Sequence, residues 1–178
     1  MPTLIRAGCA VLAASATLAF AQTPTSPSVA APSPASVPAQ MPFDIPYGTP
    51  ISLDAAKKLI AAADAEARKH DWKMNIAVAD THGDLVAFER MDGAQLASIT
   101  VSQGKARTSA RFRRETRVFF NQFESGHAYV ATLDPDLVAS PGGFPIVEGG
   151  KLIGAVGCSG GTSDQDALVC KAAADTVR

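Results

Sequence analysis

Three basic side chains and one glycine-rich segment are the groups in this chain best suited to binding an anion. Arg90 lies two residues after the end of an apolar run, while Lys105 and Arg107 lie two residues apart among small and apolar residues. The segment 157–161 reads GCSGG, and backbone N–H groups in such a turn before a helix can bind a carboxylate. Simpler roles remain open, because Arg90 can pair with Asp92 and the glycines can form a tight strand-to-helix turn.

Histidine and cysteine are the candidate metal and redox groups. His82 lies between Asp80 and Asp84, a grouping that can hold a metal ion weakly, although solvent exposure is the commoner role of such a histidine. In an oxidising compartment, a disulfide between Cys158 and Cys170 is possible. Because Cys158 falls on a predicted strand and Cys170 on a predicted helix, both among apolar residues, we expect two buried, unpaired thiols.

Two hairpins and three helices are predicted to position these side chains. Apolar runs on either side of a glycine-containing turn are typical of β-hairpins, which we expect at residues 74–79 with 85–88 and 144–148 with 151–158. Apolar spacings of three and four residues predict a helix over 53–69, and further helices are expected over 94–112 and from about 163 to the C-terminus. Since hairpins predominate, the sequence predicts an α/β domain of the α+β type, with a central antiparallel sheet and flanking helices.

The region between the second helix and the second hairpin carries basic and aromatic residues. We expect its arginines to form a solvated face: Arg111, Arg113, Arg114 and Arg117. Residues 118–123 read VFFNQF, which favours a place in the core or in a subunit interface. Residues 124–138 are expected to be irregular, and they contain His127 and Tyr129.

The N-terminal part of the chain has the features of export. Arg6 precedes an apolar run that is too short to span a bilayer, and AFA precedes Gln22, so residues 1–21 are expected to be a signal peptide. Residues 22–50 are rich in Pro, Ser and Ala and nearly uncharged, which predicts a disordered or polyproline-like linker. We place the folded domain at 51–178. The last apolar side chains of the linker can dock on it: Met41, Phe43, Ile45 and Tyr47.

Charge and hydropathy limit the partners of this protein. The net charge over 178 residues is −1, which gives no reason to expect binding to nucleic acid or to an anionic membrane. No later segment approaches the length of a membrane span. We therefore expect a periplasmic or secreted protein.

Four segments, taken in order and with their spacing, resemble the GlcG/HbpS family of haem-binding and haem-degrading proteins. They are VADTHGDLVAFERMDGA, SQGKART, PGGFPI and GKLIGAVGCSGGTSDQD, and the resemblance extends from about Ile51 to the C-terminus. It implies a profilin-like layering of helices on an antiparallel sheet, homo-oligomers, and haem as ligand. Other members occur in the catabolism of small acids, so the resemblance describes the fold more closely than the function.

A haem site would need an iron ligand, an apolar slot and cations for the propionates. The possible ligands are His70, His82, His127, Met91, Tyr129 and Thr108. His127 is the preferred metal ligand, because aromatic residues surround it in the sequence. The cations would come from Lys105, Arg90 and Arg107. A covalent c-type haem is excluded, because the chain has no Cys-x-x-Cys-His motif.

Three functions are consistent with these patterns. The first is an exported haem-binding protein for haem capture, storage or breakdown. The second is an enzyme or binding protein for a small organic acid, in which Lys105, Arg90 and Asp92 would move protons. The third is an oligomeric interaction module. The ligand site for the first two is predicted at Lys105, Arg90, Arg107, Thr108, Gly142, Gly143 and Gly160. The sequence does not decide whether turnover occurs.

Overall fold

A four-stranded antiparallel sheet organises the chain in the computed structural model, which describes residues 40–41 and 43–177. In order across the sheet, its strands are β2 (Leu85–Arg90), β1 (Asn75–Ala79), β4 (Lys151–Ser159) and β3 (Gly143–Glu148). Both predicted hairpins are therefore confirmed. The predicted signal peptide and most of the predicted linker lie outside the described residues.

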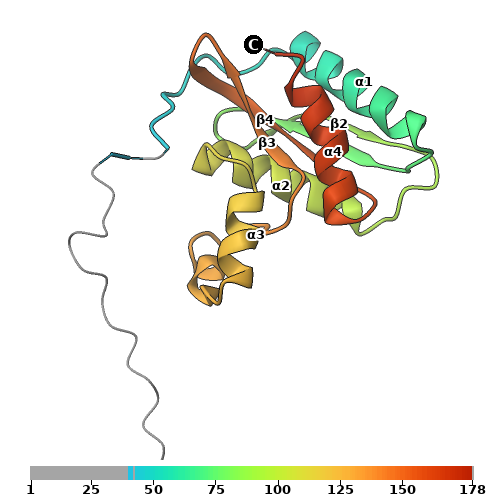
Figure 1. The fold of residues 1–178 in the computed structure, drawn as a ribbon. Helices are drawn as coiled ribbons and strands as arrows, with labels where there is room; N and C mark the ends of the chain where they lie inside the picture. Colours follow the sequence, from blue (N-terminus) through green and yellow to red (C-terminus); the bar gives the residue numbers. More distant parts are fainter. Residues whose placement is uncertain (1–39, 42, 178) are drawn as a thin grey trace, which may run out of the picture. The chain divides into compact units, whose positions relative to one another are not determined.

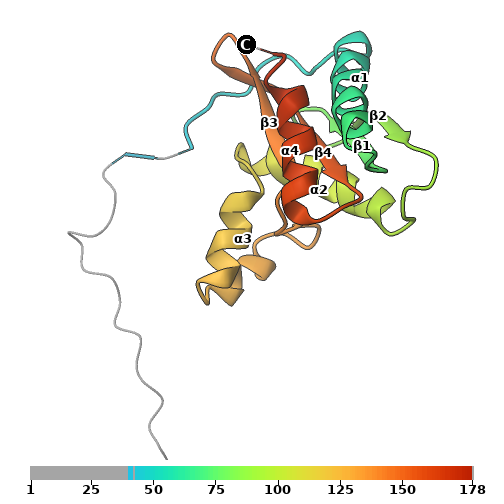
Figure 2. The same ribbon diagram turned by 45° about the vertical axis from the view of Figure 1, so that its right-hand side comes forward.

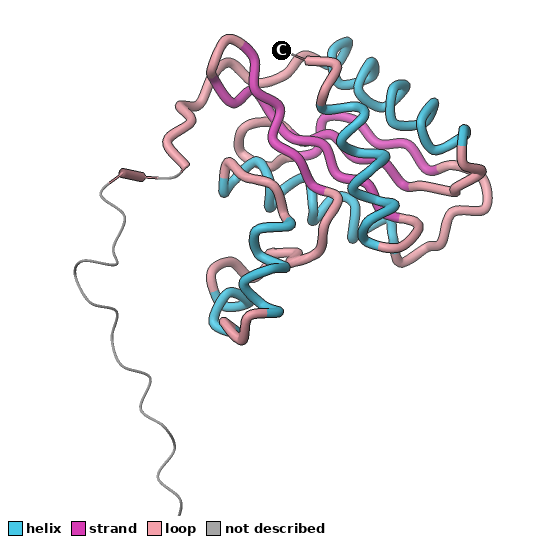
Figure 3. The backbone as a smooth tube through the Cα atoms, viewed as in Figure 1, coloured by secondary structure: helices cyan, strands magenta, loops and turns pink. Residues whose placement is uncertain are grey.

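Helices cover both faces of this sheet. The first face carries α1 (Leu53–Lys69) and α4 (Ser163–Ala174), and the opposite face carries α2 (Ser98–Phe112), as Figures 1 and 2 show. Alternation along β1 explains the layering, because Ile76 and Val78 pack in the cluster under α1 and α4. Ala77 and Ala79 instead pack against Ala106 of α2. The predicted α+β class is confirmed, and Figure 3 shows the strands enclosed between the helices.

The two helices of the first face begin at polar caps. At the start of α1, the Ser52 hydroxyl accepts a hydrogen bond from the Ala55 N–H, at 3.2 Å. At the start of α4, Thr162 and Gln165 form a capping box. No helix among the described residues is both long and apolar enough to cross a membrane.

Three predicted boundaries differ from the structure. The second helix was expected from residue 94 but begins at Ser98, because the N–H groups of Ala94 and Ser98 instead close local turns. The last helix ends at Ala174, short of the C-terminus. The aromatic segment forms a separate helix, α3 (Arg117–Glu124), followed by the short 3-10 helix η2 (Ala128–Thr132).

Close packing fixes the position of α2 on the sheet. A Cβ atom at Gly157 of β4 would overlap the carbonyl oxygen of Ser102 and the backbone nitrogen of Ala106. A Cβ atom at Gly104 would overlap the side chain of Val138, so this glycine accommodates a loop and no flat ligand is needed to explain it. Lys105, between these contacts, is held firmly in the layer between α2 and the sheet.

Candidate functional site

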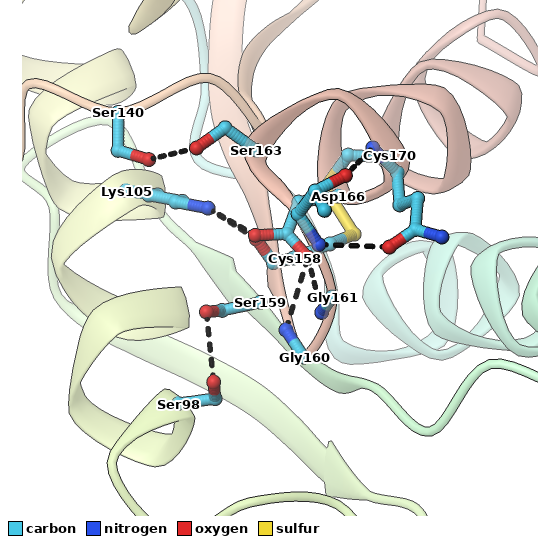
Figure 4. A network of polar contacts seen from close by, with 12 residues as sticks. Ser98, Lys105, Ser140, Cys158, Ser159, Gly160, Gly161, Ser163, Asp166 and Cys170 are labelled. Atoms are coloured by element: carbon cyan, nitrogen blue, oxygen red, sulfur yellow. Dashed lines mark hydrogen bonds and ion pairs between the residues drawn. A yellow bond between two sulfur atoms is a disulfide. The ribbon is translucent and has the colours of Figure 1, made fainter.

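A buried ion pair joins α2 to α4 at the end of β4. The Lys105 ammonium lies 2.6 Å from Asp166 Oδ2, and the two side chains are only 1% and 4% exposed. Lys105 also donates a hydrogen bond to the Cys158 carbonyl at 3.0 Å. The other carboxylate oxygen, Asp166 Oδ1, accepts the N–H groups of Gly160 and Gly161 at 3.0 and 2.9 Å. Figure 4 shows this network.

The Lys105 ammonium is a buried positive charge, and Asp166 is its one charged partner. Burial lowers the pKa of the Lys105 ammonium, and the attraction of Asp166 opposes that shift. Two backbone N–H groups and one ammonium satisfy the carboxylate on both oxygens, so the pair is well compensated. In this conformation the Lys105 ammonium presents almost no surface to a substrate.

Two predicted ligand-binding glycines belong to the packing of this centre. Gly142 has a φ of +116°, and a Cβ atom there would lie 3.1 Å from Lys105 Nζ and 2.9 Å from the Cys158 carbonyl oxygen. A Cβ atom at Gly143 would lie 2.5 Å from the Lys105 carbonyl oxygen. Gly160, the third, donates its N–H to Asp166. These glycines let two backbone segments, 142–143 and 160–161, approach the ion pair.

A disulfide closes the same corner of the molecule. Cys158 of β4 and Cys170 of α4 are bonded, with 5.5 Å between their Cα atoms. The expectation of two unpaired thiols is therefore wrong, although both residues are buried as expected. The expectation treated strand and helix as separate, but α4 packs on the first face of the sheet, where the Cys158 side chain also points.

Arg90 and Asp92 lie at the same end of the sheet, outside the buried centre. Arg90 of β2 pairs with Asn75 of β1, and Asn75 in turn pairs with Ser159 of β4. Two strand spacings therefore separate Arg90 from β4. Arg90 and Asp92 are both exposed. The structure thus gathers Lys105 and the three glycines in one place and leaves Arg90 and Asp92 on a neighbouring surface.

The other predicted residues lie apart from the ion pair. Arg107 donates to Asp136 at 3.1 Å and to the Gly83 carbonyl at 3.3 Å. Thr108 is buried, and its hydroxyl accepts the Val138 N–H. His127 is exposed at the start of η2, where its ring lies edge-on to Tyr129 with 6.0 Å between centroids. Among the described residues, no group of three His, Cys, Asp or Glu side chains is placed to hold a metal ion.

A separate cavity of about 600 Å³ opens beside the other end of α2. It is lined by Tyr47, Gly48, Pro50, Thr81, His82 and Arg111. These residues come from the segment before α1, from the β1–β2 turn and from the last turn of α2. Its volume lies within the range of about 300–1,000 Å³ found for small-molecule sites.

The β1–β2 turn presents His82 to this cavity on a well-ordered loop. Asp80 Oδ1 accepts the N–H groups of His82 and Asp84 at 2.8 and 3.0 Å, and Gly83 supplies the required φ of +89°. The Arg111 guanidinium donates to the His82 carbonyl at 3.2 Å and so ties the loop to α2. The imidazole is 77% exposed, and within the described residues Nε2 has no hydrogen-bond partner.

Cationic and aromatic groups complete the surroundings of His82. Arg111 pairs with Asp134 at 3.0 Å, whereas Arg113 has no carboxylate partner among the described residues. Arg113 instead lies over the Tyr47 ring, 5.3 Å from its centroid. The expectation that the arginines only face solvent is therefore wrong for Arg113. It is also wrong for Arg114, which lies over the Phe43 ring, and for Arg117, which pairs with Asp164. The cavity itself combines an imidazole, an aromatic ring and the guanidinium group of Arg111.

The cavity was not predicted from the sequence, although two of the segments that line it had been identified there. His82 was recognised as a hairpin tip, where exposure is the usual outcome. Met41, Phe43, Ile45 and Tyr47 were expected to dock on the domain, and the structure confirms contacts of the Phe43 and Tyr47 side chains. Ile45 is held through its backbone carbonyl, and the expectation is wrong for Met41, which is 72% exposed. No pattern in the sequence indicates that their docking place adjoins the hairpin tip.

Comparison with known proteins gives a consistent assignment. The model of the family described as "Haem degrading protein HbpS-like" matches residues 51–175. Protein GlcG of Escherichia coli strain K12 is 45% identical over 109 residues, which cover 61% of this chain and 81% of GlcG. The match to the family model begins at Ile51, directly after the segment 47–50 that forms one wall of the cavity.

Solved structures with the same fold include two with at least a quarter of their residues identical. Protein ORFY of Klebsiella pneumoniae has a TM-score of 0.68 at 27% identity, over 76% of this chain and 96% of that one. A structure described as a PduOC:heme complex has a TM-score of 0.68 at 25% identity, over 73% of this chain and 96% of that one. One similar protein has therefore been crystallised with haem.

Proposed function

This chain belongs to the HbpS-like family, and from that premise we propose that it is an exported haem-binding protein whose site is the cavity beside His82. The observation that carries the proposal is the set of groups around one cavity: the His82 imidazole, the Tyr47 ring and the Arg111 guanidinium. The haem complex of PduOC, which has the same fold, supports haem as the ligand. The predicted signal peptide supports export.

The residues at this cavity fit the requirements of haem. A haem iron takes an axial side-chain ligand, and neutral imidazole is the commonest one. His82 meets this need, because its Nε2 is without a partner in the described structure and its loop is fixed by Asp80 and Arg111. His127, the ligand preferred from the sequence, lies outside the lining of this cavity.

The remaining groups would bind the ring and its acidic substituents. Tyr47 and Pro50 offer apolar surface to a flat macrocycle, and Arg111 offers a guanidinium group to a carboxylate. A propionate at Arg111 would compete with Asp134. Arg113 does not line the cavity but lies over the Tyr47 ring. When bound, haem would supply the chemistry of its iron, and the protein's part is binding and orientation.

A haem titration of the full chain tests the proposal. We expect a Soret band that shifts on binding and saturates at one haem per chain. His82→Ala should weaken binding at least tenfold, about 1.4 kcal/mol, because the axial ligand is lost. His127→Ala is the matched control and should bind as the unaltered protein does. The absence of any spectral change at stoichiometric haem would refute the proposed function.

A further inference from the structure

The segment 43–50, called the strap from here on, extends the sheet beyond the end of β1. β1 pairs with β4 from Ala155 to Ser159. Beyond that point, the strap runs parallel to β4: Gly48 donates its N–H to the Leu152 carbonyl at 2.7 Å, and Leu152 donates its own to Pro46 at 2.8 Å. The strap thus occupies, at Leu152 of β4, the place that β1 leaves open.

The end of α2 clamps the strap from the other side. The Tyr47 hydroxyl donates to the Arg111 carbonyl at 3.1 Å, and the Arg113 guanidinium donates to the Ile45 carbonyl at 2.9 Å. The Arg114 guanidinium lies 3.5 Å from the centroid of the Phe43 ring. Three closely spaced arginines therefore contact three alternate residues of the strap.

These contacts are those of a segment that can open without unfolding the domain. No strap residue is buried, and the Tyr47 side chain is 51% exposed. Two backbone hydrogen bonds and cation–π contacts at a half-exposed surface are weak next to a packed core. In Figure 1 the strap is the cyan chain that passes the tip of the β3–β4 hairpin and leads into α1.

The strap also separates two cavities. Gly48 and Pro50 line the cavity of about 600 Å³ beside His82, and they also line a second one of about 460 Å³ toward Glu148 and Lys151. Any displacement of the strap would therefore open the wall of the proposed haem site. The match to the family model begins at residue 51, directly after the strap.

We propose that the strap is a ligand-coupled gate, in which a clamped strap and a ligand beside His82 stabilise each other. This inference rests on the proposed haem site. Because coupling between two states is reciprocal, haem should slow the opening of the strap, and loosening the strap should weaken haem. The apparent dissociation constant varies inversely with the fraction of molecules in which the strap is closed.

Phe43→Ala tests the coupling, because Phe43 contacts Arg114 and does not line the cavity. In the full chain we expect haem to bind Phe43→Ala about fivefold more weakly than the unaltered protein. Phe43→Tyr, which keeps a ring over Arg114, should bind normally. Phe123→Ala is the matched control, since it removes an exposed phenylalanine of α3.

Amide exchange supplies a readout of the strap itself. Haem should slow exchange at the Gly48 and Leu152 N–H groups, which bridge the strap and β4, and Phe43→Ala should accelerate it. Normal haem affinity in Phe43→Ala, or exchange at these amides that haem does not change, would overturn the gate and leave the haem site standing. Absence of haem binding in the unaltered protein would overturn both.

Discussion

Lys105 and Arg111 lie on the same helix, six residues apart, in opposite environments. Lys105 is almost wholly buried against Asp166, whereas the Arg111 side chain is 45% exposed and pairs with Asp134 at the rim of a cavity. The first charge has every partner it needs within the protein. The second lies beside an exposed imidazole and a half-exposed tyrosine. Two cations on one helix can therefore have different roles. Their positions in the sequence do not show that Lys105 is structural and that Arg111 is available to a ligand.

The difference also explains where ligand binding is expected in this fold. Removing a buried partner leaves an uncompensated charge, so the Lys105 centre is expected to be rigid and intolerant of change. The cavity beside His82 is held by weak, exposed contacts. Substitutions there are expected to change the free energy of unfolding little but to lower the affinity for the ligand. Substitutions at the two places should therefore affect different measurements.

The largest expected effect is on stability at the ion pair. Lys105→Met should lower the free energy of unfolding by about 3–5 kcal/mol, because Asp166 is left buried without a counter-ion. Arg111→Ala, the matched control on the same helix, should cost about 1 kcal/mol or less. Chemical denaturation measures both. Equal losses for the two variants would erase the distinction between the regions.

Adding a second substitution sharpens that result. Asp166→Leu in the Lys105→Met background should restore part of the lost stability, because no buried charge then remains. A double variant that is as unstable as the two single losses added together would show that the pair does not act as a unit.

The next largest effect is expected at the disulfide. Replacing Cys158 and Cys170 with alanine should cost about 2–4 kcal/mol, and a reducing agent should destabilise the unaltered protein by a similar amount. Denaturation with and without reductant measures this, and the double alanine variant should be insensitive to reductant. Haem affinity should change little, since the bond lies at the Lys105 centre.

The pH dependence of stability should report the Lys105 centre. Burial lowers the pKa of Lys105 in the folded state, so between that pKa and about 10.5 the unfolded chain binds more protons. Stability should therefore rise with pH across this window, by about 1.4 kcal/mol for each unit of lowering. Lys105→Met should lack this rise. An identical alkaline profile in both proteins would contradict the assignment.

The smallest effect is expected at the clamp of the strap. Arg113→Ala removes one cation–π contact with Tyr47 and one hydrogen bond to Ile45, and should lower global stability by about 0.5–1 kcal/mol. Lys57→Ala, on the exposed face of α1, is a neutral control. A loss from Arg113→Ala as large as that from Lys105→Met would mean that the strap is part of the core.

Much of the fold was predictable from local patterns. The period of α1, the cap at Ser52 and the two turns with glycine were sufficient to predict a helix and two hairpins, and the hairpins gave the antiparallel sheet. The start of α2 was predicted too early, since residues 94–97 are small enough to suit a helix yet form turns. Local propensity does not determine such boundaries.

The site was less predictable, because its partners are distant in the chain. Lys105 was singled out, but Asp166 lies 61 residues away and nothing in the spacing pairs them. His82 and Tyr47 are 35 positions apart and meet only because the strap adds to β4. The proximity of Cys158 and Cys170 likewise follows from the packing of α4 on the sheet. Composition alone described the strap as part of a linker.

The central claim is that haem binds beside His82, and paramagnetic broadening of amide signals in the isotope-labelled full chain tests it most directly. With ferric haem bound, we expect the strongest broadening at the N–H groups of Tyr47, Gly48 and residues 81–83, which surround the cavity. Broadening centred instead on residues 127–132, or on Gly142, Gly143 and Gly160, would contradict the claim and place haem at one of the sites suggested by the sequence.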